Sequence, residues 1–362
     1  MAEELDDLIT EDDEPNEEEE EVTVSYDIAT YPSDFTLSGI AEMWHREDIL
    51  IPEFQREFMW TIKQSSLLID SFLCGLPVPP VFFYIDEENR NLVIDGQQRI
   101  LTIVFFLEGY FGRESTHGKR SVFRLRGIGL KNPYLNKRFV DLDESDQRKL
   151  KQTVLRAVNI RQLRPKGEGT SAYHIFERLN TGGTPLRPQE IRNCVFRGAF
   201  TGILKHLNLD ENWRKILGRK SIDRRQRDVE FLLRVFSLVR SVDKYEKPMK
   251  EFLNKAMKAN KTGRTQRVIE FQNIFPKVTK LIVEQMGEKP FHIRGPINIA
   301  ALDSVISVLI ENYKKLPKQG LKAKMNRLLK SNDFQTWTRP GSSDAKVLQD
   351  RIALVRKVFL VK

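Results

Sequence analysis

The pattern of hydrophobic and polar positions changes near the middle of the chain. In the first half, the β-prone runs 80–85 and 92–94 flank the polar segment 86–91, which predicts a β-hairpin. Hydrophobic residues at helical spacing occur before and after this hairpin. The helices predicted in this half are 35–46, 61–73, 144–151 and one that starts after the hairpin, and further extended segments are 54–60, 122–125 and 153–163. Interleaved helices and strands predict an α+β fold.

The second half is helical nearly to its end. The helices predicted there are 172–179, 189–199, 227–241, 268–286, 298–313 and 348–359. We therefore expect an acidic disordered tail at 1–22, an α+β domain at 23–200 and an all-helical C-terminal bundle at 201–362.

Charge is distributed very unevenly along the sequence. The first 22 residues hold 13 Asp and Glu and no Lys or Arg. Without them, 59 basic residues face 37 acidic ones, which is a formal net charge of +22. A positive charge of this size on the rest of the chain favours polyanionic partners, either nucleotides or nucleic acid. Basic residues spread over helices can also serve only to keep a protein soluble. The acidic tail is expected to be a solvated segment, to shield a basic surface or to recruit a basic partner.

Cysteine and histidine usage excludes several classes of site. Cys74 and Cys194 are the only cysteines, and each is expected to be a small buried thiol rather than half of a disulfide. The five histidines lie far apart and form no zinc spacing, and no Walker-type glycine loop or Gly-x-Ser-x-Gly elbow occurs. No apolar run reaches the roughly 20 residues needed to span a bilayer, so we expect a soluble, cytoplasmic protein without a membrane partner.

The most informative motif is Asp95-Gly96-Gln97-Gln98-Arg99, at the corner between the predicted hairpin and the helix that follows it. Asp95 is expected to be the N-cap, and Gly96 to permit a tight approach of the backbone. The backbone N–H groups of a helix start favour an anion such as a phosphate, and an arginine adds donors that fit phosphate oxygens. Asp95-x-x-Gln98 also fits a capping box, which needs no ligand, and both interpretations stay open.

A second motif runs from one predicted helix through a glycine-containing loop into the next. Asn180 in this loop carries an amide that could bond a base or a phosphate, and Arg178 and Arg192 flank it with positive charge. Pro188 and Glu190 suit the first turn of a helix, so a purely structural account is equally available.

Three motifs together resemble the N-terminal domain of GmrSD-type restriction endonucleases. The resemblance is close over about residues 30–200 and looser beyond. The motifs occur in order and are Phe54-Gln55-Arg56-x-Phe58-x-Trp60, Asp95-Gly96-Gln97-Gln98-Arg99 and Phe176-x-Arg178-Leu179-Asn180-Thr181-Gly182-Gly183-Thr184-Pro185-Leu186-x-x-x-Glu190-Ile191.

This family is similar to the ParB/sulfiredoxin superfamily, in which the corresponding helix faces a nucleotide. The resemblance implies a ParB/sulfiredoxin-like domain that binds and hydrolyses a nucleoside triphosphate with a divalent cation, magnesium, in a system that restricts phage DNA. Asp95, Gln97, Gln98 and Arg99 would then be catalytic. Arg56, Gly96, Gln97, Arg99 and Asn180 would bind the nucleotide, and Asp95 is the residue that could hold the metal.

Two other functions fit the same residues. A nuclease or nickase could use the corner on DNA phosphate, although the His-Asn-His-type site of larger family members is absent here, which leaves room for a separate nuclease partner. A non-enzymatic DNA-binding or adaptor module could instead use the basic C-terminal helices. The basic cluster there comprises Arg214, Lys215, Arg219, Lys220, Arg224, Arg225 and Arg227.

Overall fold

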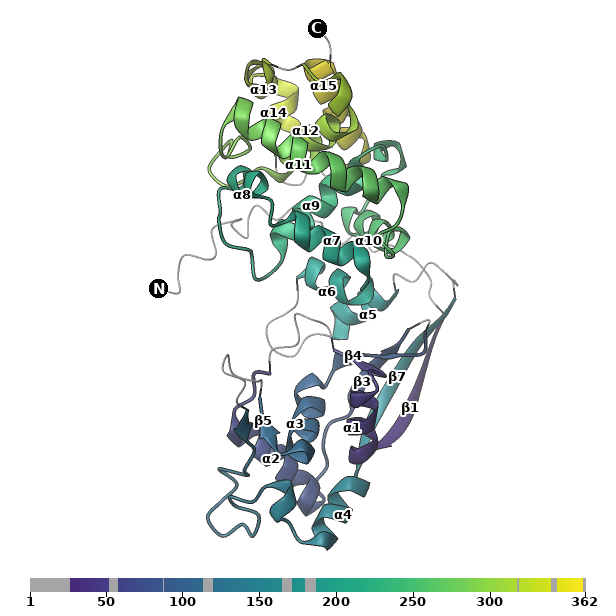
Figure 1. The fold of residues 1–362 in the computed structure, drawn as a ribbon. Coiled ribbons are helices and arrows are strands. Elements are labelled where there is room, and N and C mark those ends of the chain that lie inside the picture. The colour runs from purple at the N-terminus through teal and green to yellow at the C-terminus, as the bar shows by residue number, and fades with distance from the viewer. Residues whose placement is uncertain are drawn as a thin grey trace. The chain divides into compact units, whose positions relative to one another are not determined.

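The computed structural model describes residues 27–51, 58–86, 88–112, 120–164, 171–179, 187–317, 319–339 and 344–360. These residues fall into two compact units, one within Ser25–Pro185 and one within Leu186–Lys362 (Figure 1). The predicted acidic tail at 1–22 lies outside the described residues. The predicted domain limits stay predictions.

A five-stranded mixed sheet organises the first unit. Its order is β1-β7-β3-β4-β2, with β3 and β4 forming the predicted antiparallel hairpin and β7 running parallel to β3. The strands are β1 Asp27–Thr36, β2 Ile49–Leu50, β3 Val81–Ile85, β4 Asn91–Asp95 and β7 Val154–Arg164. A separate ribbon pairs β5 Tyr110–Phe111 with β6 Ser121–Val122, so the extended segment expected at 122–125 is wrong beyond its first residue.

Four helices and the sheet enclose the core of this unit. Among them, α3 contacts α1 and α2, and α4 contacts the same two helices. Local signals place their ends as expected, since Thr36 and Thr61 cap α1 and α2, and Gly75 ends α2 in a left-handed conformation. The helices are α1 Leu37–His45, α2 Ile62–Cys74, α3 Gln97–Glu108 and α4 Glu144–Gln152, with a short turn, η3, at Phe139–Asp141. The core includes Ile40, Ile69, Phe83, Val104 and Ala157.

The opposite face of the sheet carries α5 (Ser171–Leu179), which contacts β4. Successive side chains of a strand point to opposite faces, so Leu92 and Ile94 point away from the core residue Val93. Both are nevertheless buried, as are Tyr173 and Phe176 of α5. We conclude that the sheet is covered on both faces near β4.

The second unit is mostly helical in its described residues, as predicted. Its centre is α9, which contacts α6, α7, α10 and α12. The helices are α6 Pro188–Val195, α7 Ala199–Leu207, α8 Glu211–Leu217, α9 Arg227–Leu238, α10 Met249–Ala259, α11 Gln266–Met286, α12 Ile299–Glu311, α13 Leu321–Leu329, α14 Asn332–Trp337 and α15 Ala345–Leu360, with short turns η4 Val242–Lys244 and η5 Tyr313–Lys315. The chain is therefore mixed α/β with a helical C-terminal part.

One predicted helix, 189–199, is wrong in its extent. It ends at Val195, and a new helix starts at Ala199 after Gly198. A Cβ atom on Gly198 would lie 2.3 Å from the carbonyl oxygen of Lys261, so the break lets two backbone segments approach closely. Gly198 and Lys261 are more than sixty positions apart in the sequence, so the helical spacing of hydrophobic residues could not predict this break.

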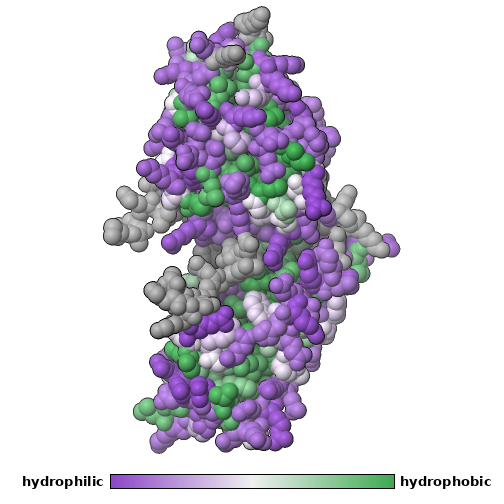
Figure 2. Space-filling view, in the orientation of Figure 1, coloured by the Kyte–Doolittle hydropathy of each residue, from purple (hydrophilic) through white to green (hydrophobic). Residues whose placement is uncertain are grey.

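Hydrophilic residues dominate the face of the molecule drawn in Figure 2, with hydrophobic residues scattered between them. In the part of the chain that the structure describes, no helix combines the length and apolarity that crossing a bilayer requires.

Candidate functional site

The corner between β4 and α3 depends on Gly96. Its φ angle is +98°, in the left-handed region that favours glycine. A Cβ atom at this position would lie 2.3 Å from Cγ1 and 3.1 Å from Cα of Val81 in β3. The predicted tight approach of the backbone is therefore an approach to the neighbouring strand, which brings the start of α3 against the start of β3.

We expect Gly96→Ala to destabilise the first unit by about 2–3 kcal/mol, because strain at φ +98° adds to a clash with backbone and side chain of Val81. Gly75→Ala is the matched control, since Gly75 has φ +73° but its Cβ would meet nothing within 4 Å. That change should cost about 1 kcal/mol. Urea unfolding followed by circular dichroism measures both, and equal losses for the two variants would contradict this account of the corner.

The expectation that Asp95 caps α3 is wrong. Gly96 occupies the N-cap position, and no side chain makes a capping hydrogen bond there. The left-handed turn at Gly96 places Asp95 one residue too early to reach the first-turn N–H groups. The capping-box interpretation of Asp95 and Gln98 fails for the same reason. Because glycine has no side chain, the N-cap residue itself satisfies none of the first N–H groups of α3.

Asp95 instead pairs with Arg99. Arg99 Nη2 donates to Asp95 Oδ2 at 2.7 Å and to the carbonyl oxygen of Pro80 at 3.0 Å. The Arg99 side chain is 16% exposed and that of Asp95 is 53% exposed. The pair thus fixes the guanidinium between the end of β4 and the start of β3, while the carboxylate remains accessible to solvent.

Two buried donors at this corner have no acceptor among the described residues. They are Gln97 Nε2 and Arg99 Nε. Gln97 is only 9% exposed, so its amide is largely removed from bulk water. Leaving a buried donor unpaired costs about 1–3 kcal/mol, so such groups call for a specific explanation. Here they lie at the positive end of a helix, where an anionic or hydrogen-bonding ligand would satisfy them.

Gln98 has a different environment from Gln97. Its Oε1 accepts from the backbone N–H groups of Met59 at 3.0 Å and Trp60 at 3.2 Å. Phe58, the preceding residue, packs edge-on against Phe105 of α3 at 5.0 Å. Gln98 and Phe58 therefore hold residues 58–60, which follow residues 52–57, against α3. Arg56, which was predicted to reach the nucleotide, lies within 52–57, outside the described residues.

The second predicted motif is described only at its edges. Asn180 and residues 181–186 lie outside the described residues. Pro188 opens α6 as expected, and Glu190 Oε2 accepts from the backbone N–H of Arg187 at 2.7 Å and pairs with Arg225 at 3.3 Å. Burial raises the pKa of Glu190, whereas the Arg187 N–H and Arg225 act in the opposite direction. Its contacts support the structural account of Glu190.

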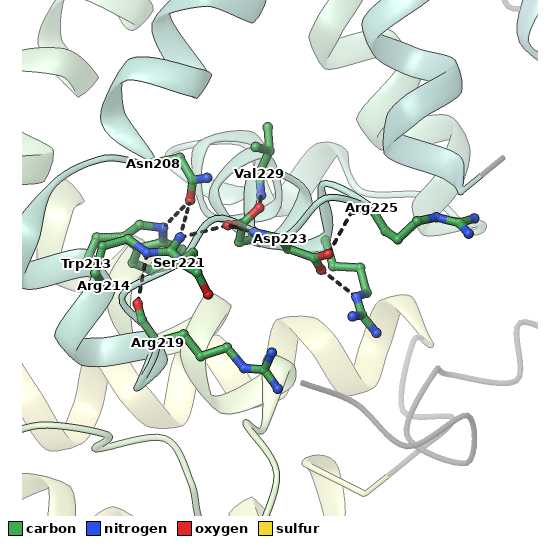
Figure 3. A network of polar contacts seen from close by, with 10 residues as sticks. Asn208, Trp213, Arg214, Arg219, Ser221, Asp223, Arg225 and Val229 are labelled. Atoms are coloured by element: carbon green, nitrogen blue, oxygen red, sulfur yellow. Dashed lines mark hydrogen bonds and ion pairs between the residues drawn. The ribbon is translucent and has the colours of Figure 1, made fainter. Parts of the chain in front are cut away.

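The predicted basic cluster separates into a buried part and an exposed part. Figure 3 shows polar contacts of Arg214 with its neighbours. Arg214 is buried and donates to Asp228 Oδ2 at 2.7 Å, to the carbonyl oxygen of Arg219 at 3.0 Å and to that of Ser221. Arg227 pairs with Asp223 at 2.5 Å. These arginines hold the loop between α8 and α9 in one conformation. The residues of the cluster that are exposed are Lys215, Lys220 and Arg224, while Arg219 is half-buried.

Metal-binding side chains are sparse. Among the described residues, no group of three or more His, Cys, Asp or Glu side chains could hold a metal ion. Asp95 is the carboxylate at the corner. A lone carboxylate fits Mg²⁺ only when phosphate oxygens or water supply the remaining ligands.

The structure therefore brings together Asp95, Gly96, Gln97 and Arg99, and directs Gln98 toward the segment before α2. Sequence reasoning missed the contribution of β3, namely Pro80 and Val81, against which Arg99 and Gly96 lie. No signal in the sequence links these residues to the corner except the hairpin itself, which pairs Phe82 with Asp95.

Comparison with known families supports the resemblance that the sequence motifs carry. Residues 39–197 match the family model described as GmrSD restriction endonuclease, N-terminal domain. The match covers less than half of the chain, and it suggests a component of a restriction or defence system. Searches of curated proteins and of solved structures found no match.

Proposed function

We propose that the corner between β4 and α3 binds and hydrolyses a nucleoside triphosphate within a DNA-restriction system. The observation that carries the proposal is the start of α3, where Gln97 Nε2 and Arg99 Nε are buried without an acceptor among the described residues. Backbone N–H groups, a helix dipole and an arginine together favour phosphate groups. The ParB/sulfiredoxin-like relationship that the sequence suggests is part of this proposal.

In this proposal, each residue of the corner has a distinct role. The N–H groups of Gly96 and Gln97 cradle a phosphate, and Arg99 stabilises the charge that develops on it during transfer. The Gln97 amide orients either the attacking water or a ribose hydroxyl. Asp95 orients Arg99 through their 2.7 Å contact. Arg56 and Asn180 would complete the phosphate and base contacts from the loops that carry them.

The proposed role of Gln98 is narrower than that of Gln97. Because its Oε1 already accepts two backbone N–H groups, Gln98 would position the Arg56 segment rather than contact the nucleotide. The Mg²⁺ ion would arrive with the triphosphate, which supplies most of its oxygen ligands, and the exposed Asp95 carboxylate is available to share it.

The experiment that tests this proposal measures phosphate release from each of the four ribonucleoside triphosphates with Mg²⁺, with and without DNA. We expect release from at least one nucleotide. Metal-dependent nicking of DNA without any release would favour the nuclease alternative at the same corner. Neither activity, together with no nucleotide binding, would overturn the proposed catalytic role.

A second candidate function is DNA contact through the loop between α8 and α9. The supporting observation is that the buried Arg214 fixes the loop while three cations on or beside it remain exposed. Lys289 extends this basic surface, because its N–H donates to the carbonyl oxygen of Lys215 at 3.2 Å. A fixed loop loses little entropy when its cations meet phosphates. A nuclease encoded separately could then act on DNA that this loop retains.

We expect replacement of Lys215, Lys220 and Arg224 by glutamine to weaken DNA binding and to flatten its dependence on salt. Each lost phosphate contact lowers the slope of log K against log salt by about 1. The matched control replaces Lys322, Arg327 and Lys330 of the α13 region, which are also exposed. Fluorescence anisotropy at several salt concentrations measures both, and equal slopes for the two triple variants would exclude the loop as the contact surface.

A further inference from the structure

The second unit contains a cavity of about 190 Å³ that the proposed function does not use. It is lined by residues at the end of α9, in the first half of α11 and at the end of α12. Its apolar part is formed by Phe236, Val239, Phe271, Ile274 and Ile310, and its polar rim by Arg240, Ser241, Gln266, Arg267, Glu270 and Glu311. An apolar cavity of about 150 Å³ is enough to admit benzene, so this one has room for a small organic molecule.

One arginine faces this apolar lining without a carboxylate partner. Arg267 makes no ion pair with any Asp or Glu among the described residues. Its Nη2 donates to the carbonyl oxygens of Phe236 and Ser237, each at 2.7 Å, and its guanidinium lies 4.6 Å from the centre of the Phe236 ring. Its Nε is buried without an acceptor among the described residues. Burial lowers the pKa of Arg267, which reflects the cost of holding this charge away from water.

The acidic residues around the cavity are already paired. Glu270 Oε2 accepts from Arg240 at 2.7 Å, and Glu270 Oε1 accepts from Gln266 at 3.3 Å. Glu311 pairs with Arg356 at 3.0 Å. Among the charged side chains that line the cavity, Arg267 is therefore the one whose positive charge no carboxylate of the described residues offsets.

A structural role explains only part of this arrangement. The two carbonyl groups that accept from Arg267 belong to the last turn of α9, where a cation stabilises a helix. That role uses Nη2 alone. It accounts neither for the unpaired Nε nor for an open apolar cavity beside an uncompensated charge.

We propose that this cavity binds a small organic anion, an aromatic or branched aliphatic carboxylate of about the size of benzoate. The carboxylate lies against the Arg267 guanidinium and neutralises it. The apolar body packs between Phe236, Phe271 and Ile274. This site lies entirely within the second unit, so it is independent of the nucleotide site proposed on the first.

The test uses sodium benzoate as the probe and benzyl alcohol as a neutral probe of similar size. Ligand-observed NMR with the full chain should detect benzoate at millimolar concentration and benzyl alcohol with an affinity at least about tenfold lower. Arg267→Gln should weaken benzoate binding by about tenfold or more, whereas Arg264→Gln, a change at an exposed arginine preceding the same helix, should leave it unchanged.

Ile274→Trp provides a second variant if Arg267→Gln does not fold. It keeps the guanidinium but fills the cavity, and should also abolish benzoate binding. The proposal is overturned if the wild-type chain shows no benzoate binding at about 10 mM. It is equally overturned if benzyl alcohol binds as well as benzoate, or if a folded Arg267→Gln variant binds benzoate as the wild type does.

Discussion

Replacing Arg99 with alanine should reduce nucleoside-triphosphate hydrolysis on the order of 100-fold or more, the loss typical of removing a group that stabilises transition-state charge. Arg99 is fixed by Asp95 and by the carbonyl oxygen of Pro80, so its guanidinium is positioned before any nucleotide arrives. Such preorganisation is what makes an arginine effective on a developing negative charge. Phosphate release under saturating nucleotide and Mg²⁺ measures the effect.

Two further variants separate catalysis from folding. Arg99→Lys keeps the charge but loses the fork of donors, and should recover only a small part of the rate. Arg46→Ala removes an arginine of the same unit whose side chain is 64% exposed and paired with Asp48, and should hydrolyse as the wild type does. Wild-type hydrolysis by a folded Arg99→Ala variant would remove Arg99 from the mechanism.

Replacing Asp228 with alanine should destabilise the second unit by about 3–5 kcal/mol, because a buried charge then loses its partner. Asp228 is fully buried and accepts from Arg214 and from the backbone N–H groups of Asp223 and Val229. Without it, the buried Arg214 guanidinium keeps neutral acceptors but no counter-charge (Figure 3). The loop between α8 and α9 should lose its fixed conformation together with this stability.

Urea unfolding followed by circular dichroism measures this loss. Lys280→Ala is the control on α11, because its pair with Glu284 is largely exposed and such pairs contribute about 0.3–0.5 kcal/mol. A loss below about 1 kcal/mol for Asp228→Ala would mean that solvent reaches Arg214 more readily than its burial indicates.

Local signals predicted the elements that carry the candidate site. The hairpin, the capping threonines and the helix start after Gly96 all follow from residues within a few positions of one another. Strand β1 was not predicted, because its polar sequence forms a strand only by pairing with β7 more than 110 residues later. Tertiary pairing of this kind leaves no periodic trace in the sequence.

The contacts of the site residues could not be predicted from the sequence and became known only from the structure. The sequence favoured Asp95 as the N-cap, whereas in the structure Gly96 takes that position in a left-handed turn packed against Val81. Gln97 and Gln98 are indistinguishable in sequence. In the structure, the Gln97 amide nitrogen is buried without an acceptor among the described residues, whereas the Gln98 amide oxygen accepts from the backbone N–H groups of Met59 and Trp60. The difference depends on which side of α3 each residue occupies and on what packs there.

The sequence was also insufficient to predict which cations of the basic cluster are buried. Arg214 and Arg227 resembled surface cations in the sequence, but Asp228 and Asp223 pair with them inside the fold. Arg225 reaches Glu190, which lies on a different helix. Charge counting along the chain cannot separate these internal pairs from the exposed lysines that remain available to a polyanion.

We propose that a nucleotide occupies the start of α3. Amide hydrogen exchange, measured with and without each ribonucleoside triphosphate and Mg²⁺, tests it most directly, because the first-turn N–H groups are the proposed ligands. With bound nucleotide, we expect slower amide exchange in peptides that contain residues 96–99 and little change in α13. Nucleotide binding that slows exchange only elsewhere, or no binding of any of the four nucleotides, would contradict it.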